Sequence, residues 1–441
     1  MRSKFSGSLL LLLVLITAQS LYAKTTPETL ARRATSADVS DSARAIAALR
    51  ELGPAGLYAL RQVHAQEIDR QIANPLVAAT PEWQRLSLAL DAVSQQKDSY
   101  LSGLYWYTDF DQAKAAARAT GKPILSLRLL GKLNEEFSCA NSRFFRTILY
   151  SNEEVARTLR EKFILHWRSE RPAPRVTIDF GDGRKLERTL TGNSIHYILD
   201  SDGRPLDALP GLYGPAAFLR SLAQVDDAFK NSNEASNDSV TPAMSRYPVA
   251  RLNAINVAWL SDIQKTGGKT PDGIRVVQDQ SGAPTAIEVA ALAMTKRVTE
   301  FTILRSMIAG GEALGAVTDE ATWKKIAFLH LADAQLDARS IGLIQRQTQK
   351  ALMADGAEKT NRALAELVQK LQMNIALDTV RNEYLLHNKL YGWLIGDQRR
   401  SNVDALNKKV YAELFLTPAS DPWLGLYSPE TYVALEGGGV R

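Results

Sequence analysis

The chain has 441 residues, of which 45% are hydrophobic and 23% are charged. These values are typical of a globular protein, and they exclude a collagen-like chain, a fully disordered chain and a small disulfide-rich scaffold. The formal net charge of +5, from 53 basic and 48 acidic residues, is too small and too evenly spread to indicate nucleic-acid binding.

The first 23 residues have the pattern of an export signal. Arg2 and Lys4 precede an uncharged apolar run at residues 9–18, and Ala23 is a small residue at which signal peptidase can cut. Because Leu21 is a poor residue two places before Ala23, an uncleaved N-terminal anchor is the alternative. No later segment reaches ~18 apolar residues, so we expect no integral membrane segment after cleavage. We therefore predict a periplasmic or secreted protein.

Residues 24–102 follow a helical period and are predicted to form an all-α N-terminal region. One helix is expected to begin at Ser40 or Asp41 and to end at Gly53, and Pro54 opens a second. The run 45–60 resembles one unit of a HEAT-type helical repeat. Since a solenoid needs about three units and we find one, we expect this helix pair to pack on the rest of the protein.

Residues 103–226 alternate short strands with helices, which is typical of an α/β sheet covered on both faces. Helices are predicted at 109–120, 151–162 and 216–222, and strands at 123–129, 163–167, 176–180, 185–190 and 195–199. The run Gly181-Asp182-Gly183 between two of these strands predicts a hairpin.

Residues 227–246 contain a polar run without apolar periodicity and are predicted to be a linker. Residues 247–441 are predicted to form a helical C-terminal domain, with an irregular tail at 416–439. Its helices are expected at 287–307, 321–331, 340–353, 360–371 and 381–394. The predicted fold class is an α/β central domain flanked by all-α N-terminal and C-terminal regions.

Four spaced motifs give the central region a more specific assignment. They occupy residues 106–110, 121–125, 139–142 and 150–155. In this order they resemble the thioredoxin-like family, specifically its exported members that open with an aromatic-Asp-Phe helix. The resemblance covers about a quarter of the chain and implies a thioredoxin-like fold for residues 103–226.

The resemblance also implies candidate site residues. Cys139, the one cysteine of the chain, falls on the nucleophilic first position of the Cys-x-x-Cys motif, and Ser142 falls on the second. A thiol at a helix N-terminus has a lowered pKa, so we expect Cys139 to be exposed and partly ionised, with burial as a small apolar residue as the alternative. Because a hydroxyl cannot resolve a mixed disulfide, dithiol exchange within the site is excluded.

Two further positions belong to this candidate site. Ser194 falls on the family's cis-proline position, so the loop that guides substrates is expected to be altered. His196 lies two residues later, on the same side of a strand, where it is placed to hold a Cys139 thiolate, and core packing is the alternative.

No cofactor or metal site is predicted. His166 is expected in the core, and residues 200–203 form a turn without the ligand spacing of a calcium loop. His330, Asp333 and Asp337 have a spacing that fits one helix face, but without a second histidine we expect a solvated face rather than a metal site.

Two functional hypotheses follow. The first is monothiol exchange through Cys139 with a protein or a small-thiol client. The second is a catalytically inactive thioredoxin-like scaffold for protein–protein interaction. Neither hypothesis involves nucleic acid.

Overall fold

The computed structural model describes residues 26–189, 193–233, 242–269, 311–352, 357–395, 402–424, 434–436 and 440. The predicted export signal, the predicted helix at 287–307 and residues 234–241 of the predicted linker lie outside the described residues. None of the helices in the described part of the chain combines the length and the apolar character that crossing a membrane requires.

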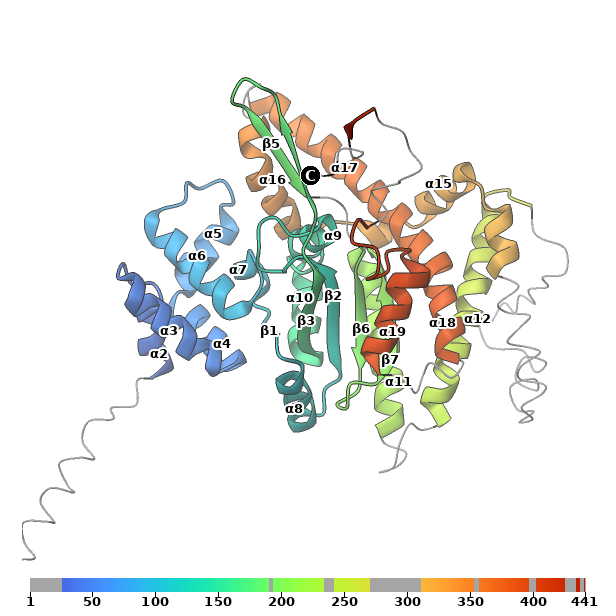
Figure 1. The fold of residues 1–441 in the computed structure, drawn as a ribbon, viewed down its shortest axis with the longest axis horizontal. Helices are drawn as coiled ribbons and strands as arrows, with labels where there is room; N and C mark the ends of the chain where they lie inside the picture. Colours follow the sequence, from blue (N-terminus) through green and yellow to red (C-terminus); the bar gives the residue numbers. More distant parts are fainter. Residues whose placement is uncertain are drawn as a thin grey trace, which may run out of the picture.

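A five-stranded sheet lies at the centre of the molecule (Figure 1). Its order is β1-β3-β2-β6-β7, in which β1, β3 and β2 run parallel, β6 is antiparallel to β2, and β7 is antiparallel to β6. The strands are β1 (Trp106–Tyr107), β2 (Ile124–Leu130), β3 (Ile164–Arg171), β6 (Ile195–Leu199) and β7 (Pro205–Pro210). All residues of β2, β6 and β7 are buried, as expected where helices cover both faces.

Strand β7 is absent from the sequence-based expectations. Its sequence begins and ends with proline and has Asp207 at its middle, which is typical of a turn rather than a strand. Pairing with all five residues of β6, with one register shift between Ile198 and Leu199, overrides this local preference.

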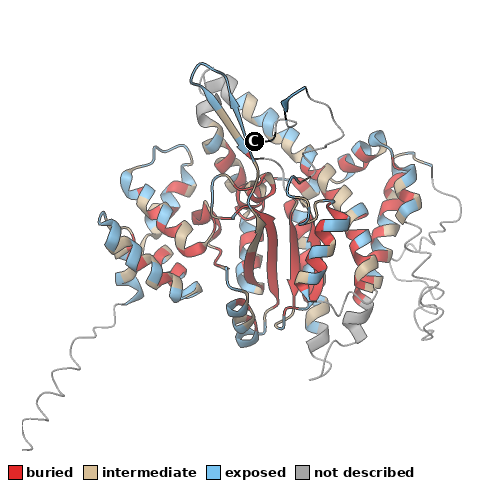
Figure 2. Cartoon of the chain, viewed as in Figure 1, coloured by how far each residue is buried: buried red, intermediate tan, exposed pale blue. Residues whose placement is uncertain are grey.

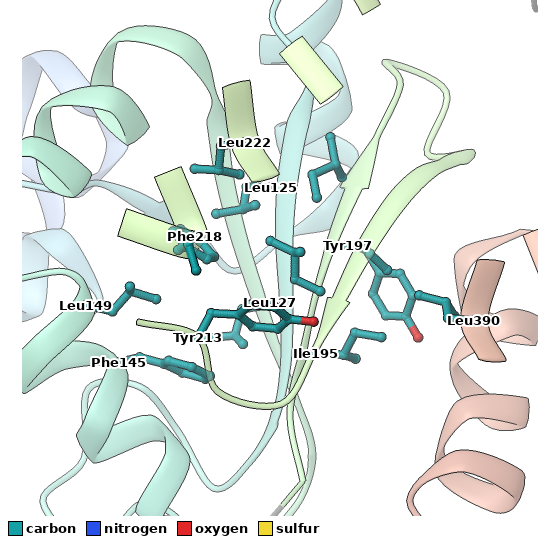
Figure 3. Close-up of a cluster of buried hydrophobic side chains, with 14 of the residues drawn as sticks. Leu125, Leu127, Phe145, Leu149, Ile195, Tyr197, Tyr213, Phe218, Leu222 and Leu390 are labelled. Carbon is teal, nitrogen blue, oxygen red and sulfur yellow. The ribbon is translucent and has the colours of Figure 1, made fainter. Parts of the chain in front are cut away.

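Helices cover both faces of the sheet. The helices of this region are α8 (Phe110–Thr120), α9 (Ala140–Phe144), the π-turn η1 (Phe145–Leu149), α10 (Glu153–Lys162) and α11 (Pro215–Asn233). Leu125 and Leu127 of β2 meet η1 and α11 on one face, while Tyr197 of β6 points toward Leu390 on the other (Figure 3). The predicted helix at 109–120 is confirmed, because the Asp109 side chain caps α8 and Gly121 ends it in the left-handed region.

The predicted hairpin is also present. It comprises β4 (Arg175–Asp179) and β5 (Lys185–Thr189), which form a separate two-stranded sheet that projects beyond the central sheet (Figure 1).

The N-terminal helices are α2 (Pro27–Arg33), α3 (Val39–Glu51), α4 (Pro54–Val63), α5 (Ala65–Ala73), α6 (Pro81–Ser94) and α7 (Ser99–Ser102). Pro54 opens α4 as predicted, whereas α3 begins earlier than predicted because the carboxylate of Asp38 caps it. A Cβ atom on Gly56 would lie 1.9 Å from the Leu49 carbonyl oxygen, so α3 and α4 touch through their backbones. The Tyr105 hydroxyl donates a hydrogen bond to the Arg50 carbonyl oxygen at 3.0 Å and joins this pair to the rest of the protein.

The C-terminal part contains α12 (Pro242–Lys265), α15 (Glu320–Leu329), η2 (Leu331–Ala334), α16 (Ala338–Leu352), α17 (Ala357–Arg381), η4 (Asn382–His387), α18 (Asn388–Ile395), α19 (Val403–Lys409) and η6 (Val410–Leu414). The prediction for 381–394 corresponds to the π-turn η4 followed by α18. Helix α11 is longer than the predicted 216–222 and continues to Asn233, into the predicted linker.

The central sheet and the C-terminal helices share one core. The buried residues of β2 and β6 belong to the same cluster as Trp259, Tyr384 and Leu390. Figure 2 shows this core as buried strands lying between helices that are buried only on their inner sides. The C-terminal helices therefore pack directly against the central sheet and help to bury its residues.

Candidate functional site

Cys139 lies at the beginning of α9, shortly after β2. Its sulfur accepts a hydrogen bond from the backbone N–H of Ser142 over 3.4 Å, and its own N–H donates to the Leu130 carbonyl oxygen at 3.4 Å. This is the helix-start position that the resemblance implies for the cysteine. The sulfur replaces the side-chain oxygen that ordinarily caps a helix.

The expectation that this thiol is exposed and partly ionised is wrong. Cys139 is 0% exposed. Burial has the largest effect on the thiol and raises its pKa above the ordinary value, and the smaller opposing effects of the Ser142 N–H and of Arg143 do not reverse this. Because the thiolate is the reactive form, a buried thiol with a raised pKa is a poor nucleophile.

Segments that are distant in the sequence close the surroundings of Cys139. At the base of the hairpin, the Thr189 hydroxyl donates to the Ser138 carbonyl oxygen at 2.8 Å. From η6, the Tyr411 hydroxyl donates to the Asn193 carbonyl oxygen at 3.0 Å. Burial raises the pKa of Tyr411, and electrostatic repulsion from an ionised Cys139 raises it further. The C-terminal segment is thus tied to the loop before β6 and lies near Cys139.

Ser142 occupies the second motif position as a buried hydroxyl. It is 0% exposed, and its Oγ has no hydrogen-bond partner in the described part of the structure. Ser142 therefore acts on Cys139 through its backbone N–H and not through its side chain.

Ser194 braces the loop before β6 against α9. Its Oγ accepts a hydrogen bond from Asn141 Nδ2 at 2.9 Å, and its carbonyl oxygen accepts one from the Gly211 N–H at 2.8 Å. No cis peptide bond occurs among the described residues, which include the bond between Asn193 and Ser194. The loop that would carry a cis-proline is instead a trans connection held by a buried serine.

His196 does not provide a cation for Cys139. Its Nε2 lies 2.6 Å from the Tyr150 hydroxyl, and its ring packs against Phe145 and Phe218 at centroid distances of 4.6 and 5.1 Å. Burial lowers the pKa of His196 to about 3, so the imidazole is neutral at physiological pH. The geometry of His196 therefore supports a role in core packing.

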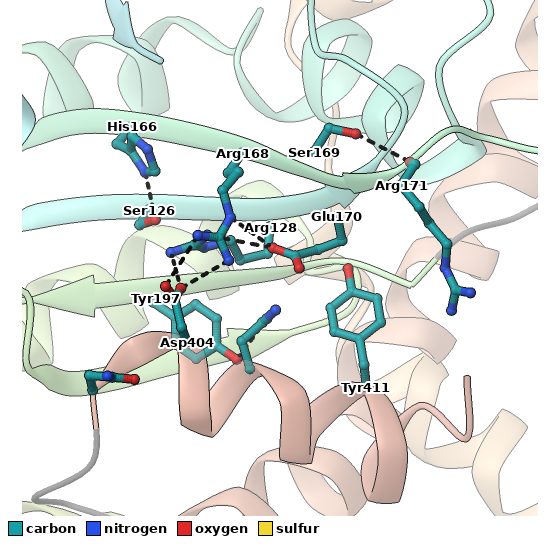
Figure 4. Close-up of polar contacts among 12 residues, drawn as sticks. Ser126, Arg128, His166, Arg168, Ser169, Glu170, Arg171, Tyr197, Asp404 and Tyr411 are labelled. Atoms are coloured by element: carbon teal, nitrogen blue, oxygen red, sulfur yellow. Dashed lines mark hydrogen bonds and ion pairs between the residues drawn. The ribbon is translucent and has the colours of Figure 1, made fainter. Parts of the chain in front are cut away.

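The other face of the sheet carries a charged cluster that the sequence did not reveal. The Arg128 guanidinium on β2 is 0% exposed and lies 3.5 Å from Glu170 and 3.2 Å from Asp404 (Figure 4). Arg168 reaches the same Asp404 carboxylate at 2.9 Å. Because 276 residues separate Arg128 from Asp404, no local pattern could have indicated this pairing.

His166 lies next to this cluster, in the core as predicted. It is 1% exposed, and the Ser126 hydroxyl lies 2.8 Å from its Nδ1 (Figure 4). Burial, and then the positive charges of Arg128 and Arg168, lower the pKa of His166 to about 3. The imidazole is therefore a neutral hydrogen-bonding partner in the interior.

A second cluster centres on His330. Its Nε2 lies 2.6 Å from Asp262 and its Nδ1 lies 3.3 Å from Asp333. The Asp333 carboxylate also accepts hydrogen bonds from the two terminal guanidinium nitrogens of Arg220, at 2.7 and 2.9 Å. Hydrogen bonds to these two carboxylates raise the pKa of His330 to about 9. Asp337 does not belong to this cluster. Its carboxylate accepts hydrogen bonds from the backbone N–H groups of Ser340 and Glu153.

The cluster is an ion-pair network rather than a metal site. Within the described ranges, no group of three or more histidine, cysteine, aspartate or glutamate side chains is arranged to hold a metal ion. The carboxylates of Asp262 and Asp333 are already neutralised by His330 and Arg220.

A groove of about 600 Å³ lies between the ends of α12, α15 and α17. Phe328 and Leu329 contribute apolar surface and are 64% and 46% exposed. Lys265, Lys324 and Lys325 also line the groove and give it a positive border.

No protein-family model matches this chain, and no curated protein and no solved structure matches it. The geometry of the described residues is therefore the evidence for what the protein does.

Proposed function

We propose that this chain is an exported, catalytically inactive thioredoxin-like protein that acts by binding another protein. The observation that carries the proposal is the closed state of Cys139, whose thiol is fully buried and whose pKa is raised. A thiol in this state presents neither the access nor the thiolate that exchange with a client requires.

The sheet supports the thioredoxin-like part of the proposal. Three parallel strands continue into an antiparallel pair, and the helix that begins at Cys139 follows the central strand β2. The β4–β5 hairpin is an insertion between the parallel and the antiparallel strands. This is the arrangement expected if the motif order in residues 103–226 reflects a thioredoxin-like unit.

The inactive part of the proposal is supported by what the motif positions do. Ser142 cannot resolve a disulfide, Ser194 bonds to Asn141, and His196 bonds to Tyr150. Each of these side chains contributes to packing between α9, η1 and β6 rather than to an open site. Loss of chemistry at all three positions is expected when a fold is retained for its surface.

The binding part of the proposal is supported by the lysine-bordered groove. Its exposed Phe328 and Leu329 offer apolar area, and Lys324 and Lys325 favour an acidic partner, whereas Lys265 already pairs with Asp262 at 3.4 Å. The segment that fits is therefore an acidic peptide with apolar side chains at its centre.

Capture of extracytoplasmic proteins by immobilised chain tests this proposal. Cys139→Ala is expected to capture the same partners as the natural chain, because a buried thiol makes no contact with them. Lys324→Glu combined with Lys325→Glu is expected to lose them, and Lys132→Glu, at another exposed lysine, serves as the matched control. Loss of all partners in Cys139→Ala, together with release of natural partners by a reductant, would overturn the proposal in favour of exchange.

Monothiol exchange remains a second candidate because Cys139 keeps one feature of a nucleophile. The backbone N–H of Ser142 points at its sulfur, as in a helix-start thiolate site. Exchange would require the C-terminal segment around Tyr411 to move away. If Tyr411→Ala brings the rate of labelling by a thiol reagent close to that of the unfolded chain, this candidate gains support; if the thiol stays protected, it fails.

A further inference from the structure

The β4–β5 hairpin buries little of its own surface. It forms a two-stranded sheet that pairs with no other described strand, and every residue of β4 is exposed. Val176, Ile178 and Phe180 leave 39%, 48% and 55% of their surface open. Because an isolated two-stranded hairpin is marginally stable in water, a third strand along β4 would stabilise it.

The register shows which backbone groups of β4 are free. The N–H of Phe180 donates to the Arg184 carbonyl oxygen at 3.1 Å, in the same register that pairs Arg175 with Thr189. Since bonded and non-bonded pairs alternate in an antiparallel ladder, the backbone groups of Val176 and Ile178 face β5. The groups of Arg175, Thr177 and Asp179 therefore point outward from the edge of the hairpin.

The sequence of β4, Arg-Val-Thr-Ile-Asp, is complementary to itself when two copies run antiparallel. If Thr177 lies opposite Thr177 of the partner subunit, Arg175 lies opposite Asp179 of the partner subunit, and Val176 lies opposite Ile178 of the partner subunit. The outward backbone groups at the three odd positions then bond to each other, as the ladder requires. Opposite-charge pairs and β-branched pairs are the cross-strand neighbours that stabilise sheets.

The charges of β5 extend this complementarity. Asp179 already pairs with Lys185 at 3.2 Å, and Arg175 pairs with Glu187 at 3.2 Å. Across four strands the charges then alternate from Lys185 to Asp179, to Arg175 of the partner subunit and to Glu187 of the partner subunit. A strand that carries a basic residue opposite Arg175 or an acidic residue opposite Asp179 would be repelled, whereas a second copy of β4 pairs both charges.

We propose that β4 is a self-association strand, through which two copies of this chain form a four-stranded antiparallel sheet with its two-fold axis at Thr177. This goes beyond the proposed binding function and does not depend on it. The contact area is small, so the dimer is expected to be concentration-dependent.

Charge reversal tests the proposed register. Arg175→Asp places a carboxylate opposite Asp179 of the partner subunit, and Asp179→Arg places a guanidinium opposite Arg175 of the partner subunit. Each variant alone is expected to dimerise about tenfold more weakly than the natural chain in sedimentation velocity, because the symmetry changes two pairs at once. An equimolar mixture of the two variants is expected to recover the dimer. In the mixed dimer, one cross-strand pair joins the natural Arg175 and the natural Asp179. The other pair joins the two introduced side chains, which also carry opposite charges.

Recovery in the mixture cannot come from a repaired hairpin, because each protein keeps its own altered Glu187 or Lys185 pair when the two are mixed. Arg188→Asp, a charge reversal on the exposed part of β5, is the matched control and is expected to leave the dimer unchanged. Natural chain that stays monomeric at all concentrations would overturn the proposal, and so would a mixture that shows no recovery.

Cysteine cross-linking provides a second measurement. Thr177→Cys places two thiols across the two-fold axis at the Cα separation of a bonded antiparallel pair, about 5.5 Å, which a disulfide can bridge. Oxidation is expected to give a covalent dimer, whereas Asp182→Cys at the hairpin tip is expected to give much less. Equal cross-linking of the two variants would overturn the proposed axis.

Discussion

Arg128 and Asp404 form an ion pair at 3.2 Å although 276 residues separate them in the sequence. Arg128 is completely buried, while Asp404 keeps 48% of its side chain exposed. The pair joins the centre of the sheet to α19, the helix that precedes η6, from which Tyr411 bonds to the Asn193 carbonyl oxygen. Charges on the sheet therefore hold the C-terminal segment in place.

Asp404→Ala is expected to destabilise the protein. It leaves the buried Arg128 beside Arg168 with Glu170 as its remaining described carboxylate partner. Breaking a buried pair costs ~3–5 kcal/mol, and solvent screening of the half-exposed carboxylate reduces this to about 1–2 kcal/mol in the free energy of unfolding. Urea denaturation measures the change.

Asp182→Ala is the matched control for this change. Asp182 is also about half exposed, at 49%, and pairs with Arg184 at the surface of the hairpin. We expect no measurable change in its unfolding midpoint. Equal effects of the two substitutions would contradict a structural role for the Arg128 pair.

Ser142→Ala is expected to leave stability unchanged or to raise it by up to ~1 kcal/mol, because the Ser142 hydroxyl is buried without a hydrogen-bond partner among the described residues. Ser151→Ala is the control, since Ser151 Oγ donates to Thr147 and lies 3.0 Å from Ser340 Oγ. The control is expected to lose about 1 kcal/mol. A larger loss in Ser142→Ala than in Ser151→Ala would show that Ser142 has a partner in solution.

The stability of the protein is expected to fall between about pH 6.5 and pH 9 through His330. Its carboxylate partners raise its pKa to about 9 in the folded chain, whereas an unfolded histidine titrates near 6.5. The contribution is therefore complete below pH 6.5 and is lost as pH rises through 9. Thermal unfolding of the natural chain and of His330→Gln, recorded from pH 6 to 10, is expected to converge at the alkaline end, with a difference of about 2 kcal/mol at pH 6.

His330 itself can be observed directly in the same pH range. Its imidazole C–H resonance in a proton NMR spectrum is expected to titrate with a midpoint near 9. A midpoint near 6.5, or parallel stability curves for the natural chain and His330→Gln, would show that Asp262 and Asp333 do not hold a charged imidazole.

The buried histidines are expected to make the protein sensitive to acid. Burial lowers the pKa of His196 to about 3 in the folded chain. As pH falls below 6.5, the unfolded chain therefore binds a proton at this residue that the folded chain does not bind. Stability is therefore lost as pH falls from 6.5 toward 3. His196→Gln removes this proton, so its unfolding midpoint in urea is expected to change less with pH over that range than the midpoint of the natural chain.

Local features of the molecule were predictable from the sequence because short-range forces produce them. The Asp109 side chain caps α8, Gly121 ends it in the left-handed region, and Pro54 opens α4. The run 181–183 turns the hairpin, and β6 has its predicted bounds, residues 195–199. Each of these outcomes depends on groups within a few residues of one another.

The state of the candidate site could not be predicted in this way. The sequence placed Cys139 at the beginning of a helix, and it lies there. Whether the thiol is open or closed depends on how remote segments pack around it, among them η6, whose Tyr411 interacts electrostatically with Cys139. Burial outweighs the helix-start effect because removing a thiolate from water costs more than the nearby backbone groups and Arg143 return.

By itself, then, the sequence determined the ends of α8, the start of α4, the hairpin and the position of the cysteine at a helix start. Only the tertiary structure decided that β7 joins the sheet, that Asp404 reaches Arg128, and that the thiol is buried. The physical reason is range: caps and turns form between neighbouring residues, whereas burial and ion pairing depend on where remote segments pack.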